Sequence, residues 1–364
     1  MKRADGVQVV ALDLVRGVAA LAVFLTHVRN SSFVEFGALP LEDRTTLAGA
    51  FFGVSRLGHE AVMVFFVLSG FLVGGQILRR LVNRTFDLRV YMIDRATRIW
   101  LPLVPACIVS ALVGAFALEQ PTRPLQIFLN AVGLNEILTD TLPSNAPLWT
   151  LAYEIWFYVT AGAFGYLVAS RFKSQAALVF GVVCMAIFSI LSARYLLYWG
   201  LGASMIFLLD SVHRRKLALL GGLLFLAGVG CSQLAGESRS VRVAAIVPLS
   251  VAEAMLCCGF SLLIPFLSSA RANSMLVRLT GAAAFLSSIS YTLYLLHFPL
   301  LLGISRWPPF ERAQDLSSPA ILACLVKAIA VFTACYVFYL VFERNTAALR
   351  RYLRSTRELS IGLR

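Results

Sequence analysis

The feature that most constrains this chain is a series of long apolar stretches that recurs along its whole length. A helix of about 20 apolar residues crosses the hydrocarbon core of a bilayer. Of the 364 residues, 59% are hydrophobic and only 14% are charged, whereas soluble domains carry roughly a quarter charged residues. We therefore expect an all-α fold, a polytopic bundle of transmembrane helices.

About ten spans can be marked from the apolar pattern. They cover residues 8–28, 58–78, 99–118, 147–168, 175–193, 195–210, 217–235, 243–267, 280–303 and 319–342. Asp13 and Arg16 interrupt the first apolar stretch and no small-residue cleavage site follows it, so we expect a mature helix and not a signal peptide. Residues 1–345 are expected to form one transmembrane domain, followed by a basic cytoplasmic tail over 346–364.

The distribution of charge predicts the orientation. Basic residues gather in the stretch from Arg79 to Arg98, in "HRRK" at 213–216 and in the tail, whereas the stretch from Glu119 to Asp140 has more acidic than basic residues. Positively charged loops stay in the cytoplasm, so both termini are expected there. The same rule, with attraction to anionic membrane lipid, explains the net charge of +13, which does not indicate a nucleic-acid partner.

The cysteines and histidines do not indicate a metal site. All seven cysteines lie in apolar segments without a CxxC pair, and such cysteines usually act as small hydrophobic residues. The histidine spacings match no zinc site, and no glycine-rich phosphate loop is present. We therefore expect no metal and no bound cofactor.

The first span, "LDLVRGVAALAVFLTH", carries three ionisable side chains. Arg16 and His27 are eleven residues apart, within about 20° of three full helical turns, so they share a face about 16 Å apart. Asp13 is close enough along the helix to pair with Arg16. Intramembrane ionisable residues are more often functional than structural, although a structural ion pair and an interfacial histidine remain the alternative.

Other spans offer partners for this polar face. Glu154 lies in "PLWTLAYEIWFY", His59 and Glu60 begin the second span, and His297 lies in "SYTLYLLHFP". A histidine can act as a general base near neutral pH, oriented by a nearby carboxylate. Taken singly, these residues could equally form interhelical hydrogen bonds.

Arg95 and Arg98 lie one turn apart at the start of the third span, in "YMIDRATRIWLPL". A pair of arginines on one helix face suits the phosphates of a large anionic donor. The alternative is that both are ordinary anchors of a positive cytoplasmic loop.

Five sequence blocks, in order, resemble the membrane acyltransferase 3 family over essentially the whole chain. They are the Arg-x10-His pattern of Arg16 and His27, "VMVFFVLSGFLV", "DRATRIWLP" with Arg95 and Arg98, "PLWTLAYEIWFY" with Glu154, and "ISYTLYLLHFP" with His297. Members of that family O-acylate polysaccharides, lipopolysaccharide, peptidoglycan, Nod factors and some antibiotics. The chain resembles the stand-alone type, which lacks a fused extracytoplasmic domain.

The resemblance implies an integral membrane O-acyltransferase of the bacterial inner membrane. The donor would be a cytoplasmic acyl-CoA, most simply acetyl-CoA, held by Arg95 and Arg98. The acceptor would be a hydroxyl of a cell-envelope or exported glycan or glycolipid. His27 would be the base or a transient acyl carrier, with Arg16 and Glu154 assisting it. His59, Glu60, His297 and Asp13 would contact the acceptor or support the site, and the oligomeric state stays open.

The principal alternative is a proton-coupled transporter or flippase of a lipid-linked sugar or small anion. Buried arginine, histidine and glutamate side chains suit such a carrier as well. The sequence shows no inverted repeat and no pair of glycine-broken helices at corresponding positions, which are typical of secondary transporters.

Overall fold

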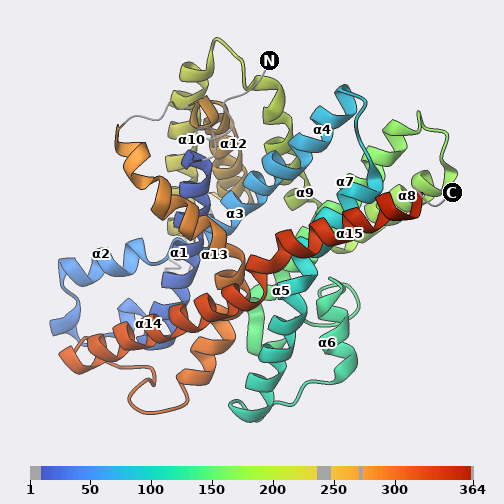
Figure 1. Ribbon diagram of the computed structural model, residues 1–364. Coiled ribbons are helices and arrows are strands. Elements are labelled where there is room, and N and C mark those ends of the chain that lie inside the picture. The colour runs from blue at the N-terminus through green and yellow to red at the C-terminus, as the bar shows by residue number, and fades with distance from the viewer. Residues whose placement is uncertain (1–9, 236–246, 270–273, 362–364) are drawn as a thin grey trace. The chain divides into compact units, whose positions relative to one another are not determined.

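The computed structural model describes residues 10–235, 247–269 and 274–361, in which every regular element is a helix (Figure 1). The all-α prediction is therefore confirmed for these residues. The α-helices are α1 (Val10–Ser32), α2 (Thr46–Val54), α3 (Gly58–Ser69), α4 (Gly75–Val82), α5 (Leu88–Phe116), α6 (Pro124–Ala131), α7 (Trp149–Ala169), α8 (Gln175–Ile190), α9 (Ala193–Ser204), α10 (Arg214–Ala235), α12 (Leu249–Ser269), α13 (Ser274–Ile304), α14 (Ser318–Val341) and α15 (Thr346–Ile361).

Each of the ten predicted spans coincides with helical structure. Among the described residues, eight helices are long and apolar enough to cross a membrane, which makes this a multi-pass membrane protein. The other two predicted spans correspond to α8, with 16 residues, and α9, with 12. Residues 8–9 and 243–246 of the predicted spans, and 362–364 of the predicted tail, lie outside the described residues.

The helix that contains the third predicted span begins earlier than that span. We expected a loop from Arg79 to Arg98, but α4 continues to Val82 and α5 already begins at Leu88. The Asp87 side chain accepts a hydrogen bond from the backbone N–H of Val90 at 2.9 Å and so caps the first turn of α5. The apolar pattern does not indicate this first part of α5, because its charged residues lower the local hydropathy without breaking the helix.

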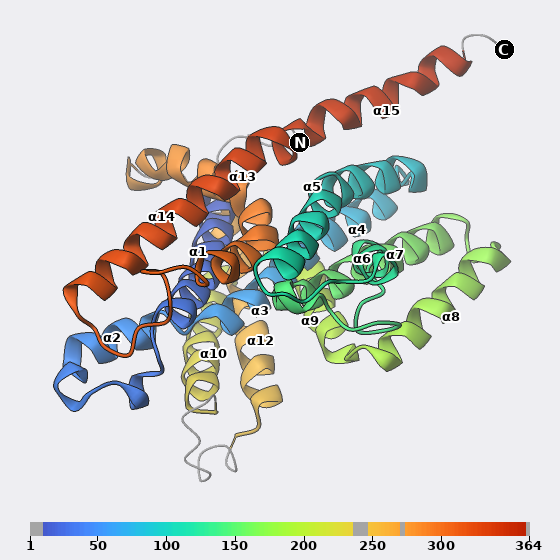
Figure 2. The same cartoon turned by 90° about the horizontal axis from the view of Figure 1, so that it is seen from below.

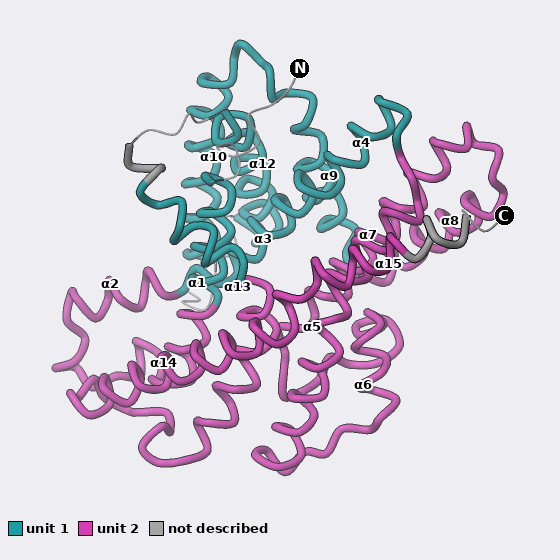
Figure 3. Tube along the Cα trace, in the orientation of Figure 1, with its two compact units in different colours: residues 1–23, 56–85, 192–288 teal, residues 24–55, 86–191, 289–364 magenta. Residues whose placement is uncertain are grey.

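Two compact units, coloured in Figure 3, make up the chain. The first unit comprises residues 1–23, 56–85 and 192–288. In it α10 and α12 lie side by side (Figures 1 and 2), and α9 packs against α3 and the π-helical turn Gly70–Gly74. A Cβ atom added to Gly70 would lie 1.9 Å from the carbonyl oxygen of Trp199. Glycine therefore permits the close approach of these helices.

The second unit comprises residues 24–55, 86–191 and 289–364. In it α5 packs against α6, α7 and α15, and α7 packs against α8, where the rings of Phe157 and Phe188 stack with centroids 5.8 Å apart. A short 3₁₀ turn, Glu343–Asn345, joins α14 to α15. The two helices follow one another in nearly the same direction in both ribbon views (Figures 1 and 2). The candidate site lies among the helices of this unit.

Candidate active site

Two predicted histidines meet in the second unit. The ring centroids of His27 in α1 and His297 in α13 lie 5.1 Å apart, and Phe298 packs edge-on against His27 with a centroid distance of 5.0 Å. His27 and His297 belong to two different sequence blocks of the family resemblance. The resemblance gives the order of these blocks along the chain but not their contact. The two imidazole rings therefore form a pair next to an aromatic side chain.

The tautomer of His297 follows from its contacts. Its Nδ1 lies 2.8 Å from the carbonyl oxygen of Leu293, and because a carbonyl oxygen only accepts, Nδ1 carries the hydrogen. In the neutral ring, Nε2 then has a free lone pair. This atom is buried and has no hydrogen-bond partner among the described residues. Since buried polar atoms are normally satisfied, Nε2 is positioned to accept a hydrogen bond from a neighbouring ring or a ligand.

Tyr294 contacts His297 through its ring and the start of α7 through its hydroxyl. The ring of Tyr294, one turn before His297, lies 6.0 Å from it by centroids. The Tyr294 hydroxyl accepts a hydrogen bond from Thr150 at 2.7 Å and donates one to the carbonyl oxygen of Pro147 at 3.1 Å. These bonds fix the start of α7, and with it the position of the acidic residue one turn later.

Glu154 and Arg95 are connected through one tyrosine. The Tyr158 hydroxyl donates to Glu154 Oε1 at 2.6 Å, and the Arg95 guanidinium carbon lies 5.4 Å from the centroid of the Tyr158 ring. The Tyr91 hydroxyl donates to the carbonyl oxygen of Tyr158 at 2.9 Å. Glu154 also interacts electrostatically with Tyr294. Polar groups therefore continue from Arg95 through Glu154 toward the histidine pair.

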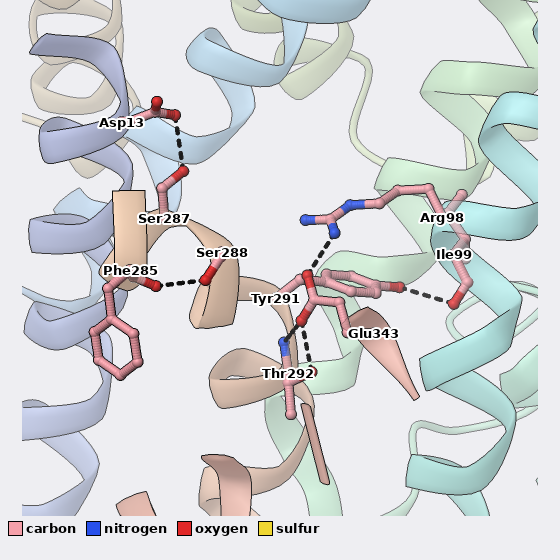
Figure 4. A network of polar contacts seen from close by, with 9 residues as sticks. All are labelled: Asp13, Arg98, Ile99, Phe285, Ser287, Ser288, Tyr291, Thr292 and Glu343. Carbon is pink, nitrogen blue, oxygen red and sulfur yellow. Dashed lines mark hydrogen bonds and ion pairs between the residues drawn. The ribbon is translucent and has the colours of Figure 1, made fainter. Parts of the chain in front are cut away.

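Arg98 has a buried carboxylate partner that the sequence analysis missed. Glu343 Oε1 lies 2.5 Å from Arg98 Nη1, and Oε2 accepts hydrogen bonds from the backbone N–H and the hydroxyl of Thr292 at 2.9 Å and 2.6 Å (Figure 4). The Arg98 guanidinium carbon lies 5.3 Å from the centroid of the Tyr291 ring. These contacts fix α5, α13 and the end of α14 to one another. Only one guanidinium nitrogen of Arg98 is used in the ion pair, and the group has five N–H donors.

A buried lysine, also missed, fixes the far end of the helix that carries His27. Lys327 in α14 is only 1% exposed. Its ammonium group donates to the carbonyl oxygen of Ser31 at 2.9 Å and to the hydroxyl of Ser305 at 3.0 Å. A cation at the C-terminus of a helix satisfies free carbonyl groups and complements the helix dipole. In the sequence this lysine is a lone charge within an apolar span, which is the signal that could have identified it.

The remaining predicted residues lie in the first unit. Asp13 accepts a hydrogen bond from the Ser287 hydroxyl at 2.9 Å (Figure 4). It also interacts electrostatically with Arg16. His59 Nε2 lies 2.9 Å from Glu253 Oε1, and Gln233 donates to Glu60 at 2.8 Å. His59 and Glu60 therefore have different partners although they are adjacent in sequence. Arg16 and His27 belong to one continuous helix.

The part of the chain that is described contains no group of three or more His, Cys, Asp or Glu side chains that could hold a metal ion. The second unit brings imidazole, carboxylate, hydroxyl and guanidinium groups together. A neutral imidazole with an unprotonated ring nitrogen can take a proton from an alcohol.

Comparison with known proteins assigns the family. A family model described as "Acyltransferase domain", the acyltransferase 3 model, matches residues 9–340. The chain belongs to the acyltransferase 3 family. The five sequence blocks predicted this family, and the prediction is confirmed.

One curated relative also has an acyltransferase name. "Acyltransferase MdmB" of Streptomyces mycarofaciens is 30% identical over 162 residues, which is 42% of this chain and 38% of that protein. The chain therefore spans less than half of the relative's length. No solved structure matches the chain.

Proposed function

We propose that this protein transfers an acyl group, most simply acetyl, from a cytoplasmic acyl-CoA to a hydroxyl of a cell-envelope or exported glycan in the bacterial inner membrane. The observation that carries the proposal is the contact of His27 with His297, with ring centroids 5.1 Å apart. Both belong to blocks that resemble the family. The glycan class of acceptor and the cytoplasmic acyl-CoA donor both follow from that resemblance.

In this proposal His27 is the general base. Its neutral imidazole takes the proton of the acceptor hydroxyl as the oxygen attacks the thioester carbonyl carbon. The new C–O bond forms, the C–S bond breaks, and the departing CoA thiolate takes the proton from the imidazolium. A second route, in which His27 first carries the acyl group itself, leads to the same products.

His297 positions His27 by means of its free Nε2. The Leu293 carbonyl oxygen fixes Nδ1 of His297 as the donor. Its Nε2 has no hydrogen-bond partner among the described residues, and in this proposal a small rotation of the His27 ring lets Nε2 accept the His27 ring N–H. That bond fixes the tautomer of His27 and leaves its other nitrogen with a lone pair for the acceptor. Histidine bases are commonly oriented in this way by a partner on the second ring nitrogen.

Glu154 and Arg16 have supporting roles in the proposal. The Glu154 carboxylate, held by Tyr158, accepts hydrogen bonds from acceptor hydroxyl groups. Arg16, on the same helix as His27, contacts the donor or tunes the basicity of His27. Asp13, His59 and Glu60 are further candidates for contacting the acceptor or for positioning residues that do. The proposed reaction does not depend on the oligomeric state.

Arg95 and Arg98 bind the donor. Arginine presents a planar fork of N–H groups that matches phosphate oxygens. From Tyr291, which Arg98 contacts, to His297 is six residues of α13, or about 9 Å along the helix axis. The pantetheine arm of a CoA thioester is long enough to cover this path, so phosphates bound near α5 place the thioester near His27.

The experiment uses sealed inside-out membrane vesicles containing either the wild-type protein or the His27→Ala variant. Acetyl-CoA labelled in the acetyl group is added outside, and label is followed into lipid-soluble and polysaccharide fractions after addition of cell-envelope glycans. Label that enters a glycan fraction only with the wild-type protein supports the proposal. Equal incorporation by a folded His27→Ala protein contradicts the role of His27, and label confined to a non-glycan fraction contradicts the acceptor class.

A further inference from the structure

The helix after the last span brings two further arginines to the proposed donor end. Arg354 Nη2 donates to Asp94 Oδ1, and Arg350 Nε lies 3.8 Å from the same oxygen. The two arginines are four residues apart and therefore share one face of α15. Asp94 is the neighbour of Arg95 in α5, so α15 contacts the turn that carries the predicted donor residues.

These side chains form a basic cluster, which we define as Arg95, Arg98, Arg350 and Arg354. Arg350 interacts electrostatically with the other three and with Asp94. Among the described side chains, the ion pairs of the basic cluster involve two carboxylates, Asp94 and Glu343. Four guanidinium groups against two carboxylates leave an excess of two positive charges.

The cluster also has unused donors. The Nε atoms of Arg95 and Arg350 are buried, and neither has a hydrogen-bond partner among the described residues. Buried N–H groups without a partner are rare in folded proteins. A ligand with several negatively charged oxygens would satisfy both the donors and the excess charge.

The direction of the arginines distinguishes a donor from a lipid headgroup. Arg350 and Arg354 both contact Asp94, a residue only 8% exposed, so they lie on the face of α15 that packs against α5, although the Arg354 side chain is still 42% exposed. Arg351, on the same helix, is exposed and has no part in the cluster. The cluster is also continuous with the path toward the histidines, since Arg95 lies over Tyr158, which bonds Glu154.

We propose that Arg350 and Arg354 of α15, together with Arg95, bind the phosphate groups at the nucleotide end of the CoA donor. Glu343 holds Arg98 beside them. This inference rests on the proposed function, because it names further residues for the same donor. It makes α15 part of the donor site and not only a basic tail at the membrane surface.

The test measures CoA binding by calorimetry to protein in nanodiscs made of phosphatidylcholine, which carries no net charge. We expect the Arg350→Gln/Arg354→Gln double variant to bind CoA about 100-fold more weakly than the wild type, about tenfold for each charge-assisted contact. The matched control Arg351→Gln is expected to stay within about twofold of the wild type, since an equal charge is removed from the exposed face of α15.

Asp94→Asn separates phosphate contact from simple docking of α15. If the arginines bind phosphate, this variant removes a competing anion, and CoA binds as tightly as before or more tightly. If they serve only to hold α15 against α5, Asp94→Asn weakens CoA binding as much as the double variant does. That second result overturns the inference, as does an unchanged CoA affinity of the double variant.

Two further arms identify the source of the phosphate and separate the two proposals. With acetyl-pantetheine, which lacks the nucleotide phosphates, wild type and double variant should transfer acetyl with the same KM. If the CoA affinities of the wild type and the double variant differ only in nanodiscs with anionic phosphatidylglycerol, the arginines bind lipid headgroups. That result overturns the inference. Failure of the wild-type protein itself to bind CoA contradicts the donor in the proposed function, whereas normal wild-type binding with an unaffected double variant contradicts this inference alone.

Discussion

His27 of α1 and His297 of α13 lie with their ring centroids 5.1 Å apart, and Nε2 of His297 is buried without a hydrogen-bond partner among the described residues. The two residues are separated by most of the chain. Their contact brings the first and the last histidine-bearing blocks into one place. It also gives the proposed base a neighbour that can fix its tautomer, and the first prediction follows from this.

His297→Phe should lower the turnover number for acyl transfer about 100-fold while leaving the KM for acyl-CoA nearly unchanged. The substitution keeps an aromatic ring in the buried space but removes the lone pair that orients His27, and proton-transfer catalysis is commonly worth at least this factor. Steady-state kinetics in reconstituted vesicles measure both constants. A wild-type turnover number in the folded variant would show that His297 only fills space.

Glu343→Gln should destabilise the protein by about 3 kcal/mol, because it leaves the guanidinium group of Arg98 without its buried counter-charge. Thermal unfolding in detergent, calibrated with denaturant, gives the change in unfolding free energy. The double variant Glu343→Gln/Arg98→Gln should lose less than the sum of the two single variants. Strict additivity would mean that the two side chains do not interact.

Lys327→Met should cost about 1–3 kcal/mol of stability, the usual effect of leaving a buried acceptor without its donor. The affected acceptor is the Ser31 carbonyl oxygen, at the end of the helix that carries His27. Hydrogen exchange of the last turn of α1 should also become faster. Unchanged exchange and unfolding would show that water replaces the ammonium group without loss.

Gly70→Ala should prevent correct packing of α3 against α9, since the added Cβ would lie 1.9 Å from the Trp199 carbonyl oxygen. Loss of folded protein in detergent, followed by size-exclusion chromatography, is the measurement. Gly222→Ala in α10 is the matched control, because its Cβ would meet no atom within 4 Å. Equal yields of the two variants would contradict the close contact.

Much of the fold could be predicted because, in a membrane protein, the apolar pattern nearly determines which segments are helices. In a bilayer, backbone groups must be satisfied within the segment, so long apolar stretches become helices. The shared face of Arg16 and His27 needs only the helical pitch, and α1 is continuous through both residues.

The partners of the polar residues could not be predicted from local pattern. Asp13 was expected to pair with Arg16, and it does interact with that charge, but its hydrogen bond goes to Ser287 in a distant segment. Glu343 resembles an interfacial charge that follows a span, and only tertiary packing brings it to Arg98. The start of α5 was missed because helix formation there depends on a cap at Asp87 and not on apolar residues.

The central claim is that His27 performs the proton transfer of an acyltransferase, and initial rates of acetyl transfer test it most directly. Reconstituted wild-type, His27→Gln and His213→Gln proteins would be compared at saturating acetyl-CoA and acceptor, with folding checked by chromatography. His213 is an exposed histidine in a basic segment, so its variant controls for loss of a histidine as such. We predict a fall of about 10³-fold or more for His27→Gln and a rate within about twofold of wild type for His213→Gln. A folded His27→Gln protein that transfers acetyl at the wild-type rate would contradict the account.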